Sequence, residues 1–125
     1  MEVKCATSFD ERFDPRNVLD KDNMQTFWLT TGLYPQEILI QLKAPKVISE
    51  VKFNTQGARK IVIEGCKQAN SQTFTRIGES KDLPERSGFQ SDSVTITEQA
   101  PINSFKFIIQ DGWEEFTSVH SVSIQ

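Results

Sequence analysis

The chain has 125 residues, of which 37% are hydrophobic and 25% are charged, and its formal net charge is −3. A chain of this size predicts one globular domain over residues 1–125, with a core that needs no disulfide bridge. The acidic balance argues against nucleic acid as a partner, because no positive field would attract phosphates.

The N-terminal residues 1–5 contain no apolar segment of a secretory signal, and no apolar run is long enough for a membrane helix. We therefore expect no membrane insertion, and we place the chain in the cytosol or in a compartment continuous with it. Cys5 and Cys66 should then be reduced thiols on strands. They lie far apart and have no CxxC companion, so zinc binding is not expected.

One helical turn is predicted at residues 15–19. Asp14 is a good N-cap and Pro15 is well suited to the first helical position. No amphipathic helix of ten or more residues competes with it elsewhere in the chain.

The segment from Asp14 to Trp28 is an oxygen-rich loop. Calcium accepts about six to eight oxygen ligands of mixed kinds at roughly 2.3–2.6 Å, whereas magnesium demands a tighter octahedron. The segment is not an EF-hand, because it has no glycine and no bidentate glutamate at its end. From composition alone, an ordinary polar loop is the alternative interpretation. The side chains that could supply oxygens are Asn17, Asp20, Asp22, Asn23 and Thr26.

The rest of the chain is typical of short strands separated by turns, because apolar and polar residues alternate. We expect strands at residues 36–43, 47–55, 59–67, 73–79, 93–97, 103–110 and 117–124. Seven or eight such strands predict an all-β, antiparallel jelly-roll sandwich. The apolar residues expected on the inner faces include Ile38, Ile40, Leu42, Val47, Val51, Phe53, Ile61, Ile63, Phe105, Phe107 and Ile109.

No catalytic constellation is apparent. The single histidine, His120, is expected on a strand face with Val122 and Ile124, where a structural role is the better interpretation. The common hydrolase, phosphate-binding, zinc-protease and dinucleotide motifs are missing. Composition alone leaves a paired-carboxylate glycosidase open, but such an enzyme normally needs a deep cleft, which a domain this small rarely has. We therefore expect a protein that is not an enzyme.

Three strings carry a resemblance to a known family. Residues 17–20, followed by Thr26-Phe27-Trp28, resemble the first calcium loop of galactose-binding-like, discoidin-type jelly rolls. Residues 26–38 and the C-terminal strings 105–109 and 116–123 resemble the intraflagellar transport protein twenty-five (heat-shock protein beta eleven) family. The resemblance spans about residues 6–123 and is weak between residues 47 and 98.

The resemblance implies a jelly-roll sandwich that binds one structural calcium ion. Its ligands would be Asn17 through a carbonyl, Asp20 through its carboxylate, and Thr26 through its carbonyl and hydroxyl. The turn from Asp20 to Thr26 is one residue longer than in animal members, which leaves the roles of Asp22 and Asn23 open. A further ligand near His120 or Ser121 stays unassigned.

The resemblance also implies a partner and a place in the cell. Family members form a heterodimer with a Rab-like small GTPase, and the pair joins complex B of the intraflagellar transport machinery. This implies a location in the cilium or flagellum, with a cytoplasmic pool at the basal body. No α-crystallin-type sequence supports the chaperone role that the heat-shock name suggests.

A partner surface is expected on the outer face of one sheet. Leu39, Val62 and Ile108 each fall on the otherwise polar face of their strand. If they share one exposed face, they form a patch that a monomer would not normally leave open. We therefore expect the GTPase to bind there, although a covering loop at residues 81–88 could instead hide these side chains within the monomer.

A carbohydrate- or lipid-binding module is the alternative function. Sugar sites commonly present exposed aromatic side chains beside polar groups. The candidates are Phe9, Phe13, Tyr34 and Trp113. We expect Phe9 and Phe13 to cover the end of the core rather than to lie exposed.

Overall fold

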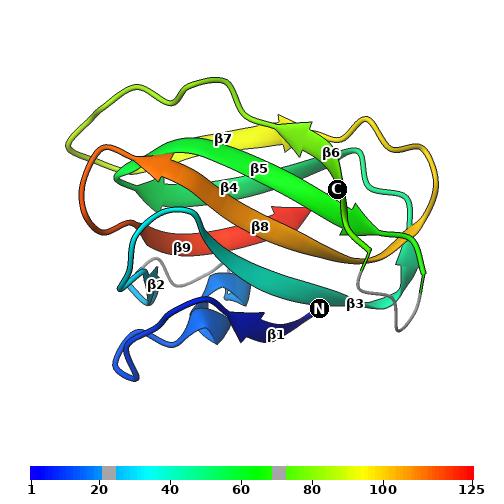
Figure 1. Ribbon diagram of the computed structural model, residues 1–125, viewed down its shortest axis with the longest axis horizontal. Coiled ribbons are helices and arrows are strands. Elements are labelled where there is room, and N and C mark those ends of the chain that lie inside the picture. Colours follow the sequence, from blue (N-terminus) through cyan, green and yellow to red (C-terminus); the bar gives the residue numbers. More distant parts are fainter. Residues whose placement is uncertain (21–24, 69–72) are drawn as a thin grey trace.

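The protein is described from a computed structural model, and the structure describes residues 1–20, 25–68 and 73–125. Two antiparallel sheets form a sandwich (Figure 1). The five-stranded sheet runs in the order β1 (Glu2–Ala6), β3 (Gln36–Lys46), β8 (Ile102–Gly112), β5 (Ala58–Cys66) and β6 (Thr75–Glu79). The four-stranded sheet runs in the order β2 (Trp28–Leu29), β9 (Ser118–Ile124), β4 (Glu50–Gln56) and β7 (Gln90–Thr95). This confirms the predicted antiparallel all-β sandwich.

The core lies between the two sheets and follows the predicted alternation. In β3 and β8 every second residue points inward, because successive side chains of a strand face opposite sides of the sheet. The two sheets meet where the ring of Phe53 from β4 packs edge-on against Phe107 from β8, with their centroids 5.8 Å apart. The buried residues that match the prediction are Ile38, Ile40, Leu42, Val51, Phe53, Ile61, Ile63, Phe105, Phe107 and Ile109.

Val47 departs from the prediction. We expected it inside, on one face with Val51 and Phe53, but its side chain is 52% exposed and Ile48 is buried instead. The strand β4 begins only at Glu50, after a turn in which the backbone N–H groups of Ser49 and Glu50 both donate to the carbonyl of Gln125. The alternation counted back from Val51 therefore stops before it reaches Val47.

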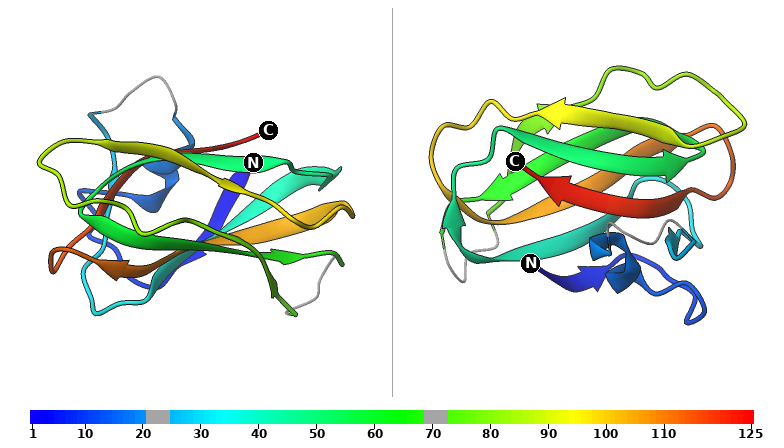
Figure 2. Two further views of the ribbon diagram at one scale, coloured as in Figure 1. Left: turned by 90° about the horizontal axis from the view of Figure 1, so that it is seen from above. Right: turned by 180° about the vertical axis from the view of Figure 1, so that it is seen from behind.

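The connections divide between the two ends of the sandwich. Residues 7–14, 30–35, 81–89 and 112–117 gather at one end, on the left of Figure 1 and on the right of the rear view in Figure 2. The β3–β4 connection, which carries Val47, lies at the opposite end. Within the described residues, Cys5 on β1 and Cys66 on β5 form no disulfide, and the thiol of Cys66 donates to the carbonyl of Gln68 at 3.1 Å. No helix among the described residues is long and apolar enough to cross a lipid bilayer.

Candidate functional site

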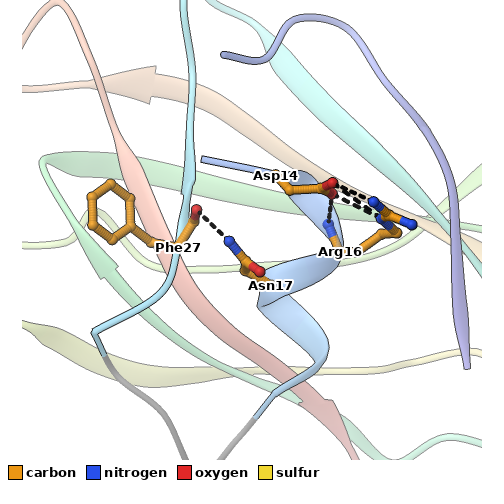
Figure 3. Close-up of polar contacts among 4 residues, drawn as sticks. All are labelled: Asp14, Arg16, Asn17 and Phe27. Carbon is orange, nitrogen blue, oxygen red and sulfur yellow. Dashed lines mark hydrogen bonds and ion pairs between the residues drawn. The ribbon is translucent and has the colours of Figure 1, made fainter. Parts of the chain in front are cut away.

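The oxygen-rich loop begins with the predicted helical turn, a 3₁₀ helix at Pro15–Leu19. The carboxylate of Asp14 accepts the backbone N–H of Arg16 at 2.8 Å, as an N-cap should, and Pro15 occupies the first turn. The guanidinium of Arg16 folds back onto the same carboxylate at 2.6 Å (Figure 3). Hydrogen bonds from the side chain and backbone of Arg16 lower the pKa of Asp14 below its ordinary value.

Asn17 ties the beginning of the loop to its end. Its side-chain amide donates to the carbonyl of Phe27 at 3.3 Å (Figure 3), and its own carbonyl accepts the N–H of Asp20 at 3.1 Å. Because Thr26 directly precedes Phe27, two of the three predicted calcium ligands belong to segments that the structure brings together. The third, Asp20, is exposed and precedes residues 21–24. Asp22 and Asn23 lie outside the described residues.

The donors in this loop are of the kind that calcium accepts. The carbonyl of Asn17, the atom expected to bind calcium, accepts one hydrogen bond from Asp20 and keeps a second lone pair, and the side-chain amide of Asn17 carries a further oxygen. Within the described ranges, no three histidine, cysteine, aspartate or glutamate side chains form a metal cluster. Calcium binding through Asn17, Asp20 and Thr26 stays a prediction.

An aromatic row supports the loop on the side of the four-stranded sheet. The ring of Phe27 stacks on Phe13 at 4.7 Å and lies 4.9 Å from the imidazole of His120. Phe89 packs edge-on against the other side of that imidazole, 4.7 Å between centroids, and a His120 ring nitrogen lies 2.9 Å from the hydroxyl of Ser118. His120 is thus buried in aromatic packing, which fits a structural role.

The expected face of His120 was wrong. We placed it with Val122 and Ile124, but β9 carries a β-bulge. Ser121 pairs with Asn54 and Val119 pairs with Thr55, so His120 is the extra residue between two paired positions. A bulge shifts the alternation by one residue, and the sequence pattern alone does not reveal it. Of the two residues named as sources of a further ligand, Ser121 accepts a hydrogen bond from the Asn54 amide at 2.7 Å.

The predicted partner residues do share one sheet face. Val62 on β5 pairs directly with Ile108 on β8, and Leu39 on β3 pairs with Lys106, two residues before Ile108. However, Val62 is only 1% exposed and Ile108 only 8%, while Leu39 is half-buried. The monomer therefore leaves little of this apolar patch open, and its contact with a partner stays a prediction.

Charged side chains, rather than the loop at residues 81–88, surround this patch. Lys106 forms an ion pair with Glu37 at 3.4 Å, and Lys60 forms one with Glu79 at 3.9 Å. The loop makes its contacts elsewhere, since the N–H of Leu83 donates to the carbonyl of Arg59 and the carbonyl of Leu83 accepts the ring N–H of Trp113. Leu39 stays accessible in a pocket of about 350 Å³ beside β1, lined by Cys5, Ala6, Thr7, Glu37, Leu39, Phe74 and Lys106.

The aromatic residues proposed for sugar binding behave differently from one another. Phe9 is 54% exposed, so the expectation that it covers the end of the core is wrong, whereas Phe13 is half-buried against Phe27. The hydroxyl of Tyr34 donates to the carbonyl of Glu114 at 2.8 Å. Burial raises the pKa of this Tyr34 hydroxyl above its ordinary value. One face of the Trp113 ring is covered by the guanidinium of Arg59 at 4.8 Å.

Sequence reasoning missed two exposed apolar side chains near these aromatics. Leu33, in the turn between β2 and β3, is 91% exposed, and Phe116, in the turn between β8 and β9, is 51% exposed. Leu33 belongs to residues 26–38 and Phe116 to residues 116–123, and both strings were interpreted only for their family resemblance. The signal that could have found them is a large apolar residue inside a turn, at Gly32-Leu33-Tyr34-Pro35 and at Glu115-Phe116.

The chain is similar in sequence to known transport proteins. It is 34% identical over 123 residues to the intraflagellar transport protein 25 of Chlamydomonas reinhardtii, covering 98% of this chain and 63% of that protein. It therefore spans less than two thirds of that relative. It is 32% identical over 124 residues to the intraflagellar transport protein 25 homologues of Mus musculus and Homo sapiens, covering 99% of this chain and 85% of theirs. No family model matches the chain.

The chain is similar in fold to carbohydrate-binding modules. The family 32 CBM of NanJ from Clostridium perfringens, solved with galactose, superposes with a TM-score of 0.78 over 96% of this chain and 90% of that one, at 18% identity. Chitosan-binding module 1 of a Paenibacillus chitosanase/glucanase gives a TM-score of 0.79 over 97% and 92%, at 16% identity. At these identities the likeness establishes the galactose-binding-like jelly-roll fold alone.

Proposed function

Because the chain belongs to the intraflagellar transport protein 25 family, we propose that it works as a non-enzymatic subunit of complex B of the intraflagellar transport machinery. One observation carries the proposal: 32% identity extends over 99% of this chain and 85% of the mouse and human family members. The transport role of the family implies a location in the cilium or flagellum, with a cytoplasmic pool near the basal body.

The partner in this proposal is a Rab-like small GTPase, bound as a heterodimer. A β-sandwich without a nameable nucleophile and base acts through its surface, and the candidate surface is the outer face of the five-stranded sheet. Leu39 would contact the GTPase through the pocket beside β1, and Val62 and Ile108 would support that contact from beneath. Lys106 and Glu37 at the rim would supply the charged contacts that are usual around an apolar centre.

One calcium ion would stabilise the loop that follows the 3₁₀ turn. Asn17, Asp20 and Thr26 are its proposed ligands, and the hydrogen bond from Asn17 to Phe27 supports this by holding two of these segments together. The ion would neutralise negative charge in the loop and link the oxygen atoms of its ligands. It takes no part in a reaction.

A carbohydrate- or lipid-binding role is the alternative. The exposed ring of Phe9 at the loop end favours it. Two observations weigh against it. Arg59 occupies a face of Trp113 that a sugar would need for stacking, and the net charge of −3 opposes binding to anionic lipid headgroups.

The proposal is tested in flagellated cells that lack their own family member. We expect the tagged chain to concentrate at the basal body and along the flagellum, and to co-purify with transport subunits. A tagged family 32 carbohydrate-binding module is the matched control, because it has the same fold at only 18% sequence identity. Diffuse cytoplasmic label without co-purification contradicts the proposal, and specific signals on a glycan array favour the alternative.

A further inference from the structure

Exposed apolar side chains concentrate at one end of the sandwich. Leu33, Phe9 and Phe116 are 91%, 54% and 51% exposed, and Trp113 is 39% exposed. They come from three connections that meet at the left end in Figure 1. We call this set, together with Glu114 and Glu115 between the two aromatics of the last connection, the loop-end surface. Single exposed apolar residues are normal, but a group at one end of a molecule indicates an interaction site.

One hydrogen-bond network fixes the three connections to each other. The hydroxyl of Ser8 accepts the N–H of Thr31 at 3.0 Å, and the N–H of Thr30 donates to the carbonyl of Thr117 at 3.0 Å. The hydroxyl of Thr117 in turn lies 2.6 Å from the hydroxyl of Tyr34. Ser8, Tyr34 and Thr117 are each adjacent in sequence to an exposed apolar residue. The network therefore holds Phe9, Leu33 and Phe116 outward on anchored backbone.

The turn that carries Leu33 is built tightly around it. The side chain of Gln36 donates to the carbonyl of Leu33 at 2.6 Å, and a Cβ at Gly32 would lie 2.8 Å from that same amide nitrogen. A larger residue at position 32 would therefore displace the amide of Gln36 from its present position. A backbone that is already fixed loses little conformational freedom on binding, which favours the use of this turn to present an apolar anchor to a partner.

The charges around the loop-end surface are unbalanced. Arg12 is already paired with Asp10 at 2.8 Å, and Arg59 lies 3.8 Å from each of Asp82 and Asp111. Glu11, Glu114 and Glu115 are exposed, and none of the three forms an ion pair with a described residue. The connection 81–89 at the same end adds one exposed cation, Arg86, and one exposed carboxylate, Glu85. The end of the sandwich therefore combines projecting apolar groups with an excess of carboxylates, and its electrostatic complement is a basic surface.

We propose that the loop-end surface docks a basic amphipathic segment of a protein partner. Apolar side chains of the segment would pack against Leu33, Phe9 and Phe116, and its lysine or arginine side chains would pair with Glu114, Glu115 and Glu11. The surface lies at the end of the sandwich, whereas the pocket beside Leu39 lies on the sheet face and reaches that end only at Thr7, so the surface gives the subunit a second contact area. A subunit inside a larger assembly needs more than one contact, and the inference does not depend on where the GTPase binds.

The test is a selection from a randomised peptide display library on the purified, immobilised chain. We expect the recovered peptides to combine apolar residues with lysine and arginine, and to bind more weakly as the salt concentration rises. Leu33→Asp, and separately Glu114→Lys with Glu115→Lys, should weaken these peptides about tenfold or more, as loss of a central anchor does. Val47→Asp is the matched control, because Val47 is similarly exposed at the opposite end and should leave binding unchanged.

Several results overturn the proposal. Recovery of no peptide contradicts the proposal. Recovery of peptides without an excess of lysine and arginine contradicts the electrostatic complementarity on which it rests. Peptides that bind Leu33→Asp as well as the parent chain use another surface. If the chain binds a glycan array and the same variants lose that binding, the loop-end surface is a carbohydrate site instead. The circular dichroism spectrum of each variant must match the parent, and Phe116→Ser replaces Leu33→Asp if it does not.

Discussion

The side-chain amide of Asn17 donates a hydrogen bond to the carbonyl of Phe27 across 3.3 Å, joining residues that are ten positions apart. This bond closes the loop whose oxygens are the proposed calcium ligands. The bond uses the nitrogen of the side-chain amide, whereas the expected calcium ligand is the carbonyl of Asn17. The ring of Phe27 also stacks on Phe13, so the loop is held by a polar and an apolar contact together.

Calcium should stabilise the folded chain through this loop. A ligand that binds only the native state adds about 2.7 kcal/mol when its concentration is about 100 times its dissociation constant. We expect the parent chain to melt at a higher temperature with calcium than with a chelator. Asp20→Ala should abolish that difference in a thermal melt followed by fluorescence.

Asp10→Asn is the matched control for Asp20→Ala. Asp10 precedes the loop and pairs with Arg12, so its variant should keep the full calcium shift. Identical melting of the parent chain in calcium and in chelator would show that the loop is not a calcium site. The same shift with magnesium, and none with calcium, would leave the site but change the metal.

The cap at Asp14 should make stability depend on pH in a defined direction. Arg16 lowers the pKa of Asp14 in the folded chain, so the stabilisation is present above the ordinary value of 3.8 and is lost as the pH falls below it. Asp14→Asn keeps a capping oxygen but removes the charge. We expect it to be less stable than the parent at pH 7 in urea unfolding, and the difference in unfolding free energy to shrink as the pH falls below 3.8.

Asp14→Ala separates the cap from the charge. It should lose about 0.5–2 kcal/mol at pH 7, the usual cost of an N-cap, and it should stay below the parent at pH 3. The charge itself should contribute little, since a third of the side chain is exposed and solvent screens the ion pair. A gap between Asp14→Asn and the parent that widens at low pH would contradict this assignment.

The contact between Phe53 and Phe107 should contribute strongly to the free energy of unfolding. Phe107→Ala should cost about 3–5 kcal/mol, because Phe107 is fully buried and its loss leaves a cavity between the sheets. Phe116→Ala removes the same ring from an exposed position and should cost far less. Urea unfolding of both variants measures the difference. Equal losses would place Phe107 outside the core.

Long alternating strands were the part of the fold that the sequence could predict. In β8 every second residue, Phe105, Phe107 and Ile109, is large, apolar and fully buried, so the pattern is unambiguous. The turn at Pro15–Leu19 was also predictable, because Asp14 and Pro15 act locally. These features depend on neighbouring residues alone.

The features that depend on distant residues were not predictable. The two-residue strand β2 exists because Trp28 and Leu29 pair with β9, about 90 residues later. The bulge at His120 is set by the register of β9 on β4. Leu33 is exposed in a turn whose next residue, Tyr34, is hydrogen-bonded to the distant connection between β8 and β9. The loop composition offered five candidate oxygen ligands, and the choice of Asn17, Asp20 and Thr26 among them came only from the family resemblance.

Two substitutions on the outer sheet face should separate folding from partner binding. Ile108→Glu places a carboxylate against Val62 in a region that solvent hardly reaches, so we expect it to unfold or precipitate. Leu39→Glu changes a half-buried residue beside an open pocket, so it should fold and lose affinity for the GTPase. Circular dichroism and a pull-down report the two effects. A folded Leu39→Glu with unchanged affinity would move the interface off this face.

The central claim is that this chain is a transport subunit paired with a Rab-like small GTPase. The most direct test mixes the purified chain with the Rab-like GTPase of the intraflagellar transport machinery and measures the mass of the eluting species by light scattering after gel filtration. The account predicts one peak with the summed mass of one copy of each protein, and no such peak with an unrelated small GTPase. Separate elution of the two proteins at every concentration and in both calcium and chelator would contradict it.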